Sequence, residues 1–145
     1  MAYAEEFNYW QTTVHPAKSH AEIIEMLEDY GIIDVNLTQG QAAGSFAWLI
    51  RFKWHGKPYR FIFTPLECKE PERVYSVGGK KRTGLEQAKY QMGRIAVYFV
   101  KAIMTAAEAH PAALFGFMEI ENTRDNSGMP LVIYEVGADK LLGSG

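Results

Sequence analysis

The sequence predicts an α+β fold, in which an antiparallel sheet of about four to five strands packs against two main helices in the order β-α-β-β-β-α-β. Two observations predict it. Apolar and polar residues alternate, as in half-buried strands, at residues 33–37, 47–54 and 59–64. Apolar residues recur at helical spacing over 19–30 and 85–109. We expect a single domain at residues 1–138 and a flexible tail at 139–145.

The composition is that of a folded, soluble domain. Of the 145 residues, 48% are hydrophobic and 22% are charged, which excludes an intrinsically disordered chain. The formal net charge of −2 excludes a histone-like polycation but not a local basic patch. Cys68 is the only cysteine, so we expect no internal disulfide and a reducing compartment. The sequence shows no signal peptide and no apolar stretch of membrane-spanning length, which predicts a cytoplasmic protein without a membrane partner.

The first predicted elements are a strand and a helix. Residues 7–14 are aromatic and β-branched, which favours a strand. Ser19 and Glu22 have the spacing of a capping box, so we expect Ser19 to cap the N-terminus of the first helix. Gly31 is placed to end that helix in the left-handed conformation. Residues 40–44 (GQAAG) are expected to form a loop.

The centre of the chain predicts a β-hairpin. Its two alternating segments, 47–54 and 59–64, flank His55-Gly56, a dipeptide suited to a tight turn. Pro65 ends the second strand, and residues 66–84 are expected to form a long polar connection.

A second helix is predicted from Leu85 to about Ala109, and its packing stripe follows the helical period. The stripe consists of Leu85, Ala88, Met92, Ala96, Phe99, Ile103 and Ala106. Beyond Pro111, we expect a short helix or strand at 112–121, a turn-rich loop at 122–128 and a last strand at 129–136.

Cations gather where the polar connection meets the second helix. Lys80, Lys81 and Arg82 precede the helix N-terminus, where outward-pointing amides and the helix dipole favour anions. Away from the packing stripe, an arc of about 100° holds Tyr90, Arg94, Val97, Lys101 and Met104. We predict that nucleic acid or an acidic partner binds the cations Lys80, Lys81, Arg82, Lys89, Arg94 and Lys101, with stacking or interface contacts from Tyr90, Tyr98 and Met104. A solvated helix face is the alternative interpretation.

The triplet Glu67-Cys68-Lys69 follows a predicted strand and resembles the E-x-K triplet of the PD-(D/E)xK nuclease core. In that core an acidic pair holds a divalent metal and the lysine activates the attacking water. Residues 46–65 contain no Asp or Glu, so the hairpin lacks the second carboxylate. No P-loop and no zinc-spaced histidine pair occurs either. We therefore predict no metal, no cofactor and no catalytic residue, and an orphan metal-dependent nuclease remains the enzymatic alternative.

Several dispersed motifs occur together in the chain. They are TTV at 12–14, S-x-x-E-I-x-x-x-L-x-x-Y-G at 19–31, F-x-x-H-G-x-x-x-R-F at 52–61 and the basic helix LEQAKYQMGRIAVYFVKA. In these positions the chain resembles a small family of phage, prophage and mobile-element proteins of unknown function, over roughly residues 9–135. The resemblance implies a viral or mobile-element origin and a bacterial host cell, and it assigns no catalytic residues.

These observations predict a non-enzymatic accessory protein of a phage or mobile element that binds nucleic acid. Contacts made mostly to phosphates would give binding with little sequence specificity and a strong dependence on salt. The second hypothesis is a protein-binding module, either an inhibitor of an acidic host protein or a homodimer. Its interface would be the exposed helix face or an uncovered aromatic face of the sheet.

Overall fold

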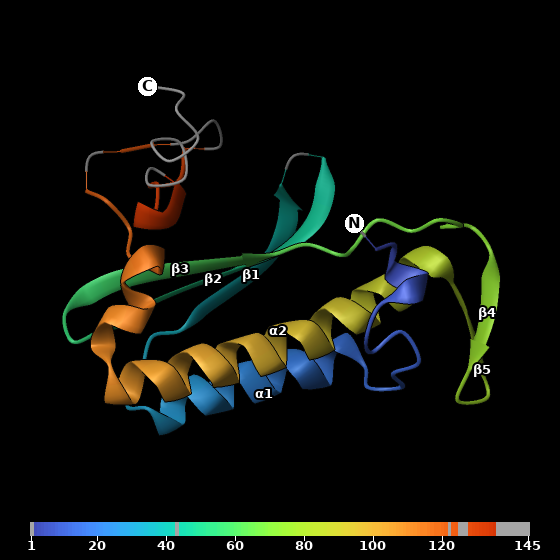
Figure 1. Ribbon diagram of the computed structural model, residues 1–145, viewed down its shortest axis with the longest axis horizontal. Coiled ribbons are helices and arrows are strands. Elements are labelled where there is room, and N and C mark those ends of the chain that lie inside the picture. The colour runs from blue at the N-terminus through green and yellow to red at the C-terminus, as the bar shows by residue number, and fades with distance from the viewer. Residues whose placement is uncertain (1, 43, 122, 125–127, 136–145) are drawn as a thin grey trace.

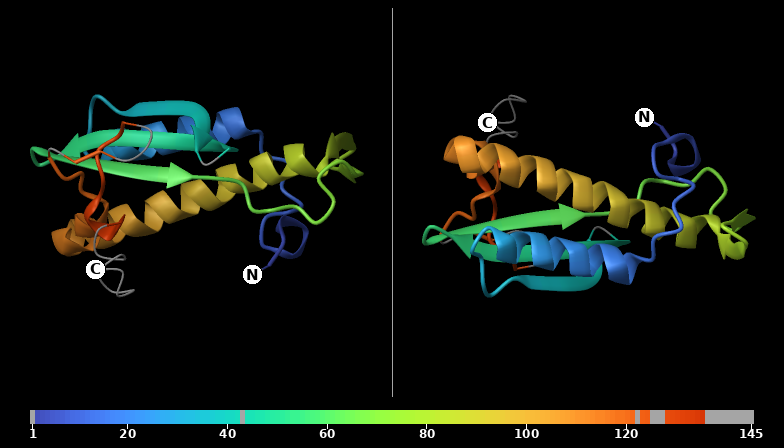
Figure 2. Two further views of the ribbon diagram at one scale, coloured as in Figure 1. Left: turned by 90° about the horizontal axis from the view of Figure 1, so that it is seen from above. Right: turned by 90° about the horizontal axis from the view of Figure 1, so that it is seen from below.

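Two long helices lie on the same side of a three-stranded antiparallel sheet (Figure 1 and Figure 2). The computed structural model describes residues 2–42, 44–121, 123–124 and 128–135. The predicted α+β class is confirmed, with helices and antiparallel sheets of three and two strands. The elements are η1 (Ala4–Glu6), α1 (Pro16–Asp29), β1 (Asn36–Ala42), β2 (Ser45–Trp54), β3 (Lys57–Phe63), β4 (Val74–Val77), β5 (Lys80–Thr83), α2 (Gly84–Ala109) and η2 (Pro111–Phe117).

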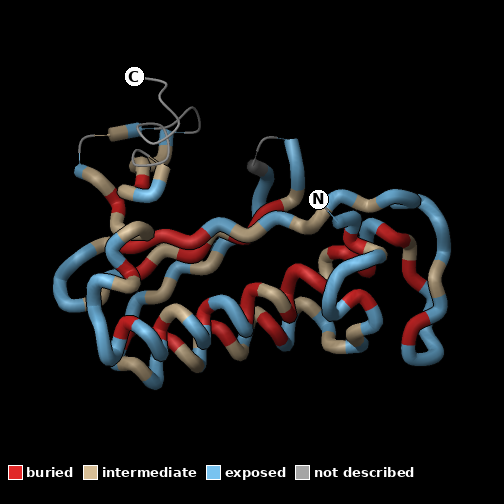
Figure 3. The backbone as a smooth tube through the Cα atoms, viewed as in Figure 1, coloured by how far each residue is buried: buried red, intermediate tan, exposed pale blue. Residues whose placement is uncertain are grey.

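The larger sheet has the order β1-β2-β3, so β2 is its central strand. Ile50 of β2 lies opposite Leu37 of β1 and Phe61 of β3. Because side chains alternate between the two faces of a strand, Trp48, Ile50 and Phe52 share one face, and all three are buried. They pack with apolar residues of α1 and α2 into the main core, which lies between the sheet and the helices (Figure 3).

The predicted β2–β3 hairpin is confirmed. His55 and Gly56 form its turn with φ angles of 50° and 76°. Positive φ at both central residues defines a type I′ turn, whose twist matches that of the flanking strands. The loop expected at 40–44 is shorter than predicted, because β1 extends to Ala42.

Helix α1 starts three residues earlier than the predicted capping box. Pro16 occupies its first turn, where a missing N–H costs nothing, and Nδ1 of His15 accepts a hydrogen bond from the Ala17 amide at 3.0 Å. The predicted capping role of Ser19 is therefore wrong, since Ser19 is fully buried inside the helix. The predicted end is confirmed, with Gly31 in the left-handed conformation at a φ of 84°.

The strand predicted at residues 7–14 is wrong, because these residues form turns and irregular chain. Tyr9 has a φ of 69°, which is incompatible with a strand. Two buried glutamines of α2, Gln87 and Gln91, hold this segment by donating from Nε2 to its backbone. The carbonyl oxygens that accept belong to Phe7, Asn8, Trp10 and Thr12 of this segment and to Ala4, which precedes it.

The expected polar connection at 66–84 contains the β4–β5 hairpin, which the sequence interpretation missed. Gly78 and Gly79 form its turn with φ angles of 60° and 80°. A Cβ added to Gly78 would lie 2.4 Å from Cγ2 of Thr13, so the turn packs closely on the N-terminal segment. This end of the molecule has a small core of Ala4, Trp10 and Ala88, with Leu66, Cys68 and Tyr75 packed against it.

Helix α2 has nearly the predicted bounds but a different buried surface. Three members of the predicted packing stripe are exposed: Leu85, Phe99 and Ala106. Three members of the arc predicted to face away from the packing stripe are buried: Arg94, Val97 and Met104. The outward orientation predicted for these three residues is wrong because α1 packs beside α2 under the sheet (Figure 1), so that α2 buries a surface against each of two neighbours. Lys101 is exposed, as predicted.

The C-terminal part folds back onto the sheet. Met118 forms an isolated antiparallel bridge with Tyr59, and Glu119 forms one with Val132. The strand predicted at 129–136 is wrong, because among its described residues only Val132 is bridged and 133–135 are helical. Most of the predicted loop at 122–128, the end of the predicted domain and the predicted tail at 139–145 lie outside the described residues.

Candidate nucleic-acid interface

Two of the predicted cationic contacts are buried and bonded within the protein. Nε of Arg82 donates to Oε1 of Gln87 at 2.8 Å, and the guanidinium lies 4.1 Å from the centre of the Tyr90 ring. Arg94 donates from Nη2 to Ser19 at 2.7 Å and to Glu22 at 2.9 Å. Only 7% of Arg82 and 9% of Arg94 is exposed. Both arginines therefore hold the fold together in the free protein rather than presenting charge to solvent.

The other predicted contacts are dispersed. Lys80 and Lys81 are exposed at the β4–β5 turn, and Lys101 is exposed on α2. Lys89 is half-buried, with Nζ 4.4 Å from the centre of the Phe46 ring. Because the β4–β5 turn lies at one end of the molecule (Figure 1), the predicted cations do not form one continuous patch.

The predicted aromatic contacts also differ in exposure. Tyr98 is 47% exposed and stacks on Tyr9, with ring centres 5.2 Å apart. Tyr90 is half-buried between Arg82 and His15. Met104 is fully buried in the main core. Of these three side chains, only that of Tyr98 is exposed to solvent.

A second local excess of positive charge lies on the β2–β3 hairpin. Its outer segment reads RFKWHGKPYR, with two arginines, two lysines and no acidic residue. The lysines, Lys53 and Lys57, are exposed on either side of the turn and have no ion pair within the described part of the chain. This turn is at the opposite end of the molecule from the β4–β5 turn (Figure 1).

The two arginines of this segment are neutralised by the C-terminal part of the chain. Arg51 and Arg60 lie directly opposite each other on β2 and β3, an arrangement of like charges that is unfavourable by itself. Arg51 forms two hydrogen bonds to Glu119, at 2.9 Å and 2.7 Å, and this bonding raises the pKa of Arg51. Arg60 forms an ion pair with Glu135. The arginines thus fasten the C-terminal segment, while the lysines remain available to a ligand.

A hollow of about 860 Å³ lies between the hairpin turn and the C-terminal segment. Its charged lining residues are Arg51, Lys53, Lys57, Glu119, Glu121 and Arg124. Arg51 and Glu119 form an ion pair, so their charges cancel. The other charged side chains give the hollow a net positive charge. Trp54 and His55 supply two aromatic rings at the turn, with centres 4.3 Å apart, but they line the space between α1 and α2 rather than this hollow. The turn therefore combines unpaired cations with rings on which a base can stack.

The Glu67-Cys68-Lys69 triplet forms part of a structural contact. The Glu5 carboxylate accepts hydrogen bonds from the amides of Lys69 and Glu70 at 2.9 Å and 2.7 Å. Burial and the nearby Glu5 carboxylate raise the pKa of the Cys68 thiol, which disfavours the nucleophilic thiolate. Within the described residues, no three His, Cys, Asp or Glu side chains are grouped to hold a metal ion.

The sequence interpretation missed Lys53 and Lys57. The sequence signal for them is the absence of Asp and Glu from residues 46–65.

No helix in the described part of the chain is long and apolar enough to cross a membrane. Among known proteins, no family model matches the chain, and no curated protein or solved structure matches it.

Proposed function

We propose that this protein is a non-enzymatic accessory protein that binds nucleic acid through the turn of the β2–β3 hairpin. The observation that carries the proposal is the pair of exposed lysines, Lys53 and Lys57, beside the rings of Trp54 and His55. The resemblance to phage and mobile-element proteins supports a role in a bacterial host cell.

The two kinds of side chain at the turn would make two kinds of contact. Lys53 and Lys57 lie on either side of the turn and can each neutralise one phosphate of a strand. His55 is exposed and Trp54 half-exposed, so unstacked bases can reach their rings. Because single strands offer unstacked bases, we propose that single-stranded nucleic acid binds more tightly than a duplex.

Fluorescence anisotropy of a labelled oligonucleotide of about 20 residues, single-stranded or duplex, tests the proposal between about 50 mM and about 200 mM salt. The key variant is Lys53→Glu/Lys57→Glu. Its matched control is Lys80→Glu/Lys81→Glu, which changes the net charge equally at the other exposed turn. Both pairs are exposed, so both variants should keep the melting temperature of the native protein.

We expect the variant at 53 and 57 to weaken binding by about tenfold or more and the variant at 80 and 81 to change it by less than about twofold. Equal weakening by both variants would show that net charge, rather than the β2–β3 turn, carries binding. An absence of binding at low salt would reject the nucleic-acid function. Metal-dependent cleavage that Glu67→Ala abolishes would instead favour the nuclease alternative.

A further inference from the structure

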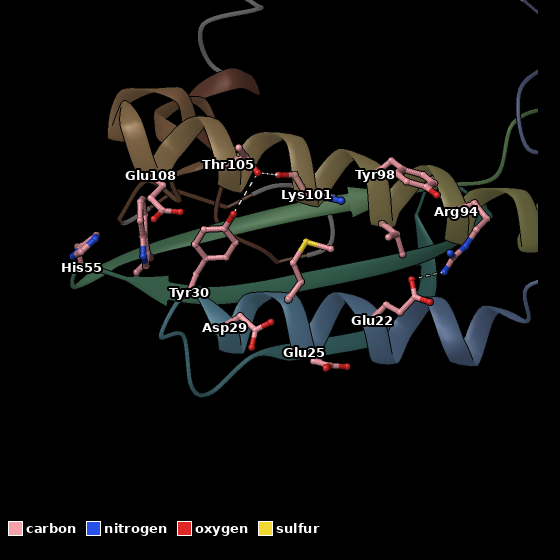
Figure 4. Close-up of a pocket in the computed structure, with 13 residues that line it drawn as sticks. Glu22, Glu25, Asp29, Tyr30, His55, Arg94, Tyr98, Lys101, Thr105 and Glu108 are labelled. Atoms are coloured by element: carbon pink, nitrogen blue, oxygen red, sulfur yellow. Dashed lines mark hydrogen bonds and ion pairs between the residues drawn. The ribbon is translucent and has the colours of Figure 1, made fainter.

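A second concave surface runs between α1 and α2, where the two helices separate. At one end Arg94 donates to Glu22 at 2.9 Å, and at the other the Tyr30 and Thr105 hydroxyls are 3.3 Å apart (Figure 4). Between these contacts, no hydrogen bond or ion pair joins described residues of the two helices. The groove that results has a volume of about 870 Å³.

The floor of this α1–α2 groove is partly apolar. Met26 of α1 is half-buried and Val97 of α2 is 5% exposed. Trp54 lines one end of the groove, and Tyr98, which is 47% exposed, lies toward the other. A ligand with an apolar face would therefore bury side chains that water now contacts.

The edges of the groove are mainly acidic. Glu25, Asp29 and Glu108 are exposed and have no ion pair within the described residues. Lys101 is the groove's unpaired cation, because Arg94 is already bonded to Glu22. The resulting negative field repels a polyanion and attracts a cation.

We propose that the α1–α2 groove binds an amphipathic helix of a partner protein, with apolar side chains on the groove floor and lysines or arginines facing α1. Charge complementarity selects a basic partner. The length of the groove fits a helix, since the fourteen-residue step along α2 from Arg94 to Glu108 rises about 21 Å, or about four helical turns. Glu25 and Asp29 are four residues apart, so they match cations at the same spacing on a facing helix.

This inference uses different charged groups from the proposed nucleic-acid function, carboxylates of α1 rather than the lysines of the β2–β3 turn, although Trp54 belongs to both surfaces. The two surfaces carry opposite charge. A substitution that makes α1 more positive should therefore weaken the binding of a basic peptide without weakening the binding of an oligonucleotide.

The probe is a labelled amphipathic peptide of about 16 residues, with leucines on one face and lysines beside them, together with a counterpart in which glutamates replace the lysines. Fluorescence anisotropy gives the Kd of each. Glu25→Lys is the test variant, and Glu28→Lys is its matched control, because Glu28 is exposed on the same helix but does not line the groove. Circular dichroism melting checks that both variants are folded.

We expect the lysine peptide to bind, the glutamate peptide not to bind, and Glu25→Lys to weaken binding about tenfold more than Glu28→Lys. Equal effects of the two variants would overturn the proposal, because they would indicate nonspecific attraction to an acidic protein. Spermidine supplies amines without an apolar face and serves as a competitor. If spermidine displaced the peptide at a concentration as low as the peptide's Kd, the proposal that a helix is the ligand would also be overturned.

Discussion

The Arg94 guanidinium holds the Ser19 hydroxyl through two hydrogen bonds, from Nε at 3.0 Å and from Nη2 at 2.7 Å. Ser19 is fully buried on α1, and Arg94 comes from the facing side of α2. The adjacent Gly93 permits this approach, since a Cβ there would lie 2.9 Å from Oγ of Ser19. The two helices are therefore joined by a polar contact where small residues bring them together.

Replacement of Arg94 by methionine should lower the free energy of unfolding by about 2–3 kcal/mol, because it leaves the buried Ser19 hydroxyl and the Glu22 carboxylate without their donor. Urea denaturation followed by circular dichroism measures the change. Lys101→Met is the control, since Lys101 is exposed and unpaired on the same helix, and it should cost less than about 0.5 kcal/mol. Similar losses for both variants would contradict a structural role for Arg94.

Replacement of Gly93 by alanine should lower the free energy of unfolding by about 1–3 kcal/mol, because the new methyl group would press on Ser19. Gly40→Ala is a matched control. An added Cβ at Gly40 meets no atom within 4 Å, so that variant should be neutral or slightly stabilising. Thermal melting of the two variants measures the difference, and a neutral Gly93→Ala would show that the helices can move apart freely.

Local sequence signals predicted the elements whose cause is local. The type I′ hairpin at His55-Gly56, the end of α1 at Gly31 and the extent of α2 follow from neighbouring residues. Local sequence signals could not predict which side of α2 is buried. Helical periodicity orders residues around an axis, but the position of α1 decides whether Arg94 faces water or a second helix.

The remaining errors have similar tertiary causes. Residues 7–14 have a strand-like composition. Their backbone carbonyl groups nevertheless accept hydrogen bonds from Gln87 and Gln91, which lie more than seventy positions later in the chain. The β4–β5 hairpin contains the Gly78-Gly79 turn signal, but its strands are largely exposed and lack the apolar alternation of a buried sheet. The sequence also does not show that Arg82 bonds to Gln87, and Arg94 to Ser19 and Glu22, within the fold.

The Glu5 carboxylate should make stability depend on pH. Burial tends to raise the pKa of Glu5, but the hydrogen bonds from the Glu70 and Lys69 amides outweigh burial and lower it. The carboxylate therefore stabilises the fold above its unfolded pKa of about 4.3, and this stabilisation is lost as the pH falls through the lower folded value. Glu5→Gln should accordingly lower the melting temperature at pH 7 and lose that effect in acid.

Glu6→Gln is the control for this pH series, because Glu6 is exposed next to Glu5 and its side chain forms no hydrogen bond with the described residues. Its melting temperature should follow that of the native protein at every pH. A difference between Glu5→Gln and the native protein that stays constant down to pH 3 would contradict the role assigned to the Glu5 carboxylate.

Replacement of Glu119 by glutamine should expose the charge of Arg51, because a neutral amide cannot replace the paired carboxylate. The free energy of unfolding should fall by about 1–3 kcal/mol. If the β2–β3 turn binds a single strand, the slope of log K against log salt should steepen by about 0.7, the value for one additional phosphate contact. Oligonucleotide titrations at several salt concentrations measure the slope, with Glu28→Gln as the equally charged control. An unchanged slope would place Arg51 outside the contact.

Helix α2 contributes to both hydrophobic cores, with Ala88 in the small core and Met92, one turn later, in the main core. The small core has three buried members, too few to be stable alone, so its order depends on the part of α2 that the sheet and α1 hold in place. The two ends of the molecule should therefore open at different free energies. Local unfolding should release the N-terminal segment and the β4–β5 hairpin first and make the Cys68 thiol accessible while the three-stranded sheet remains folded.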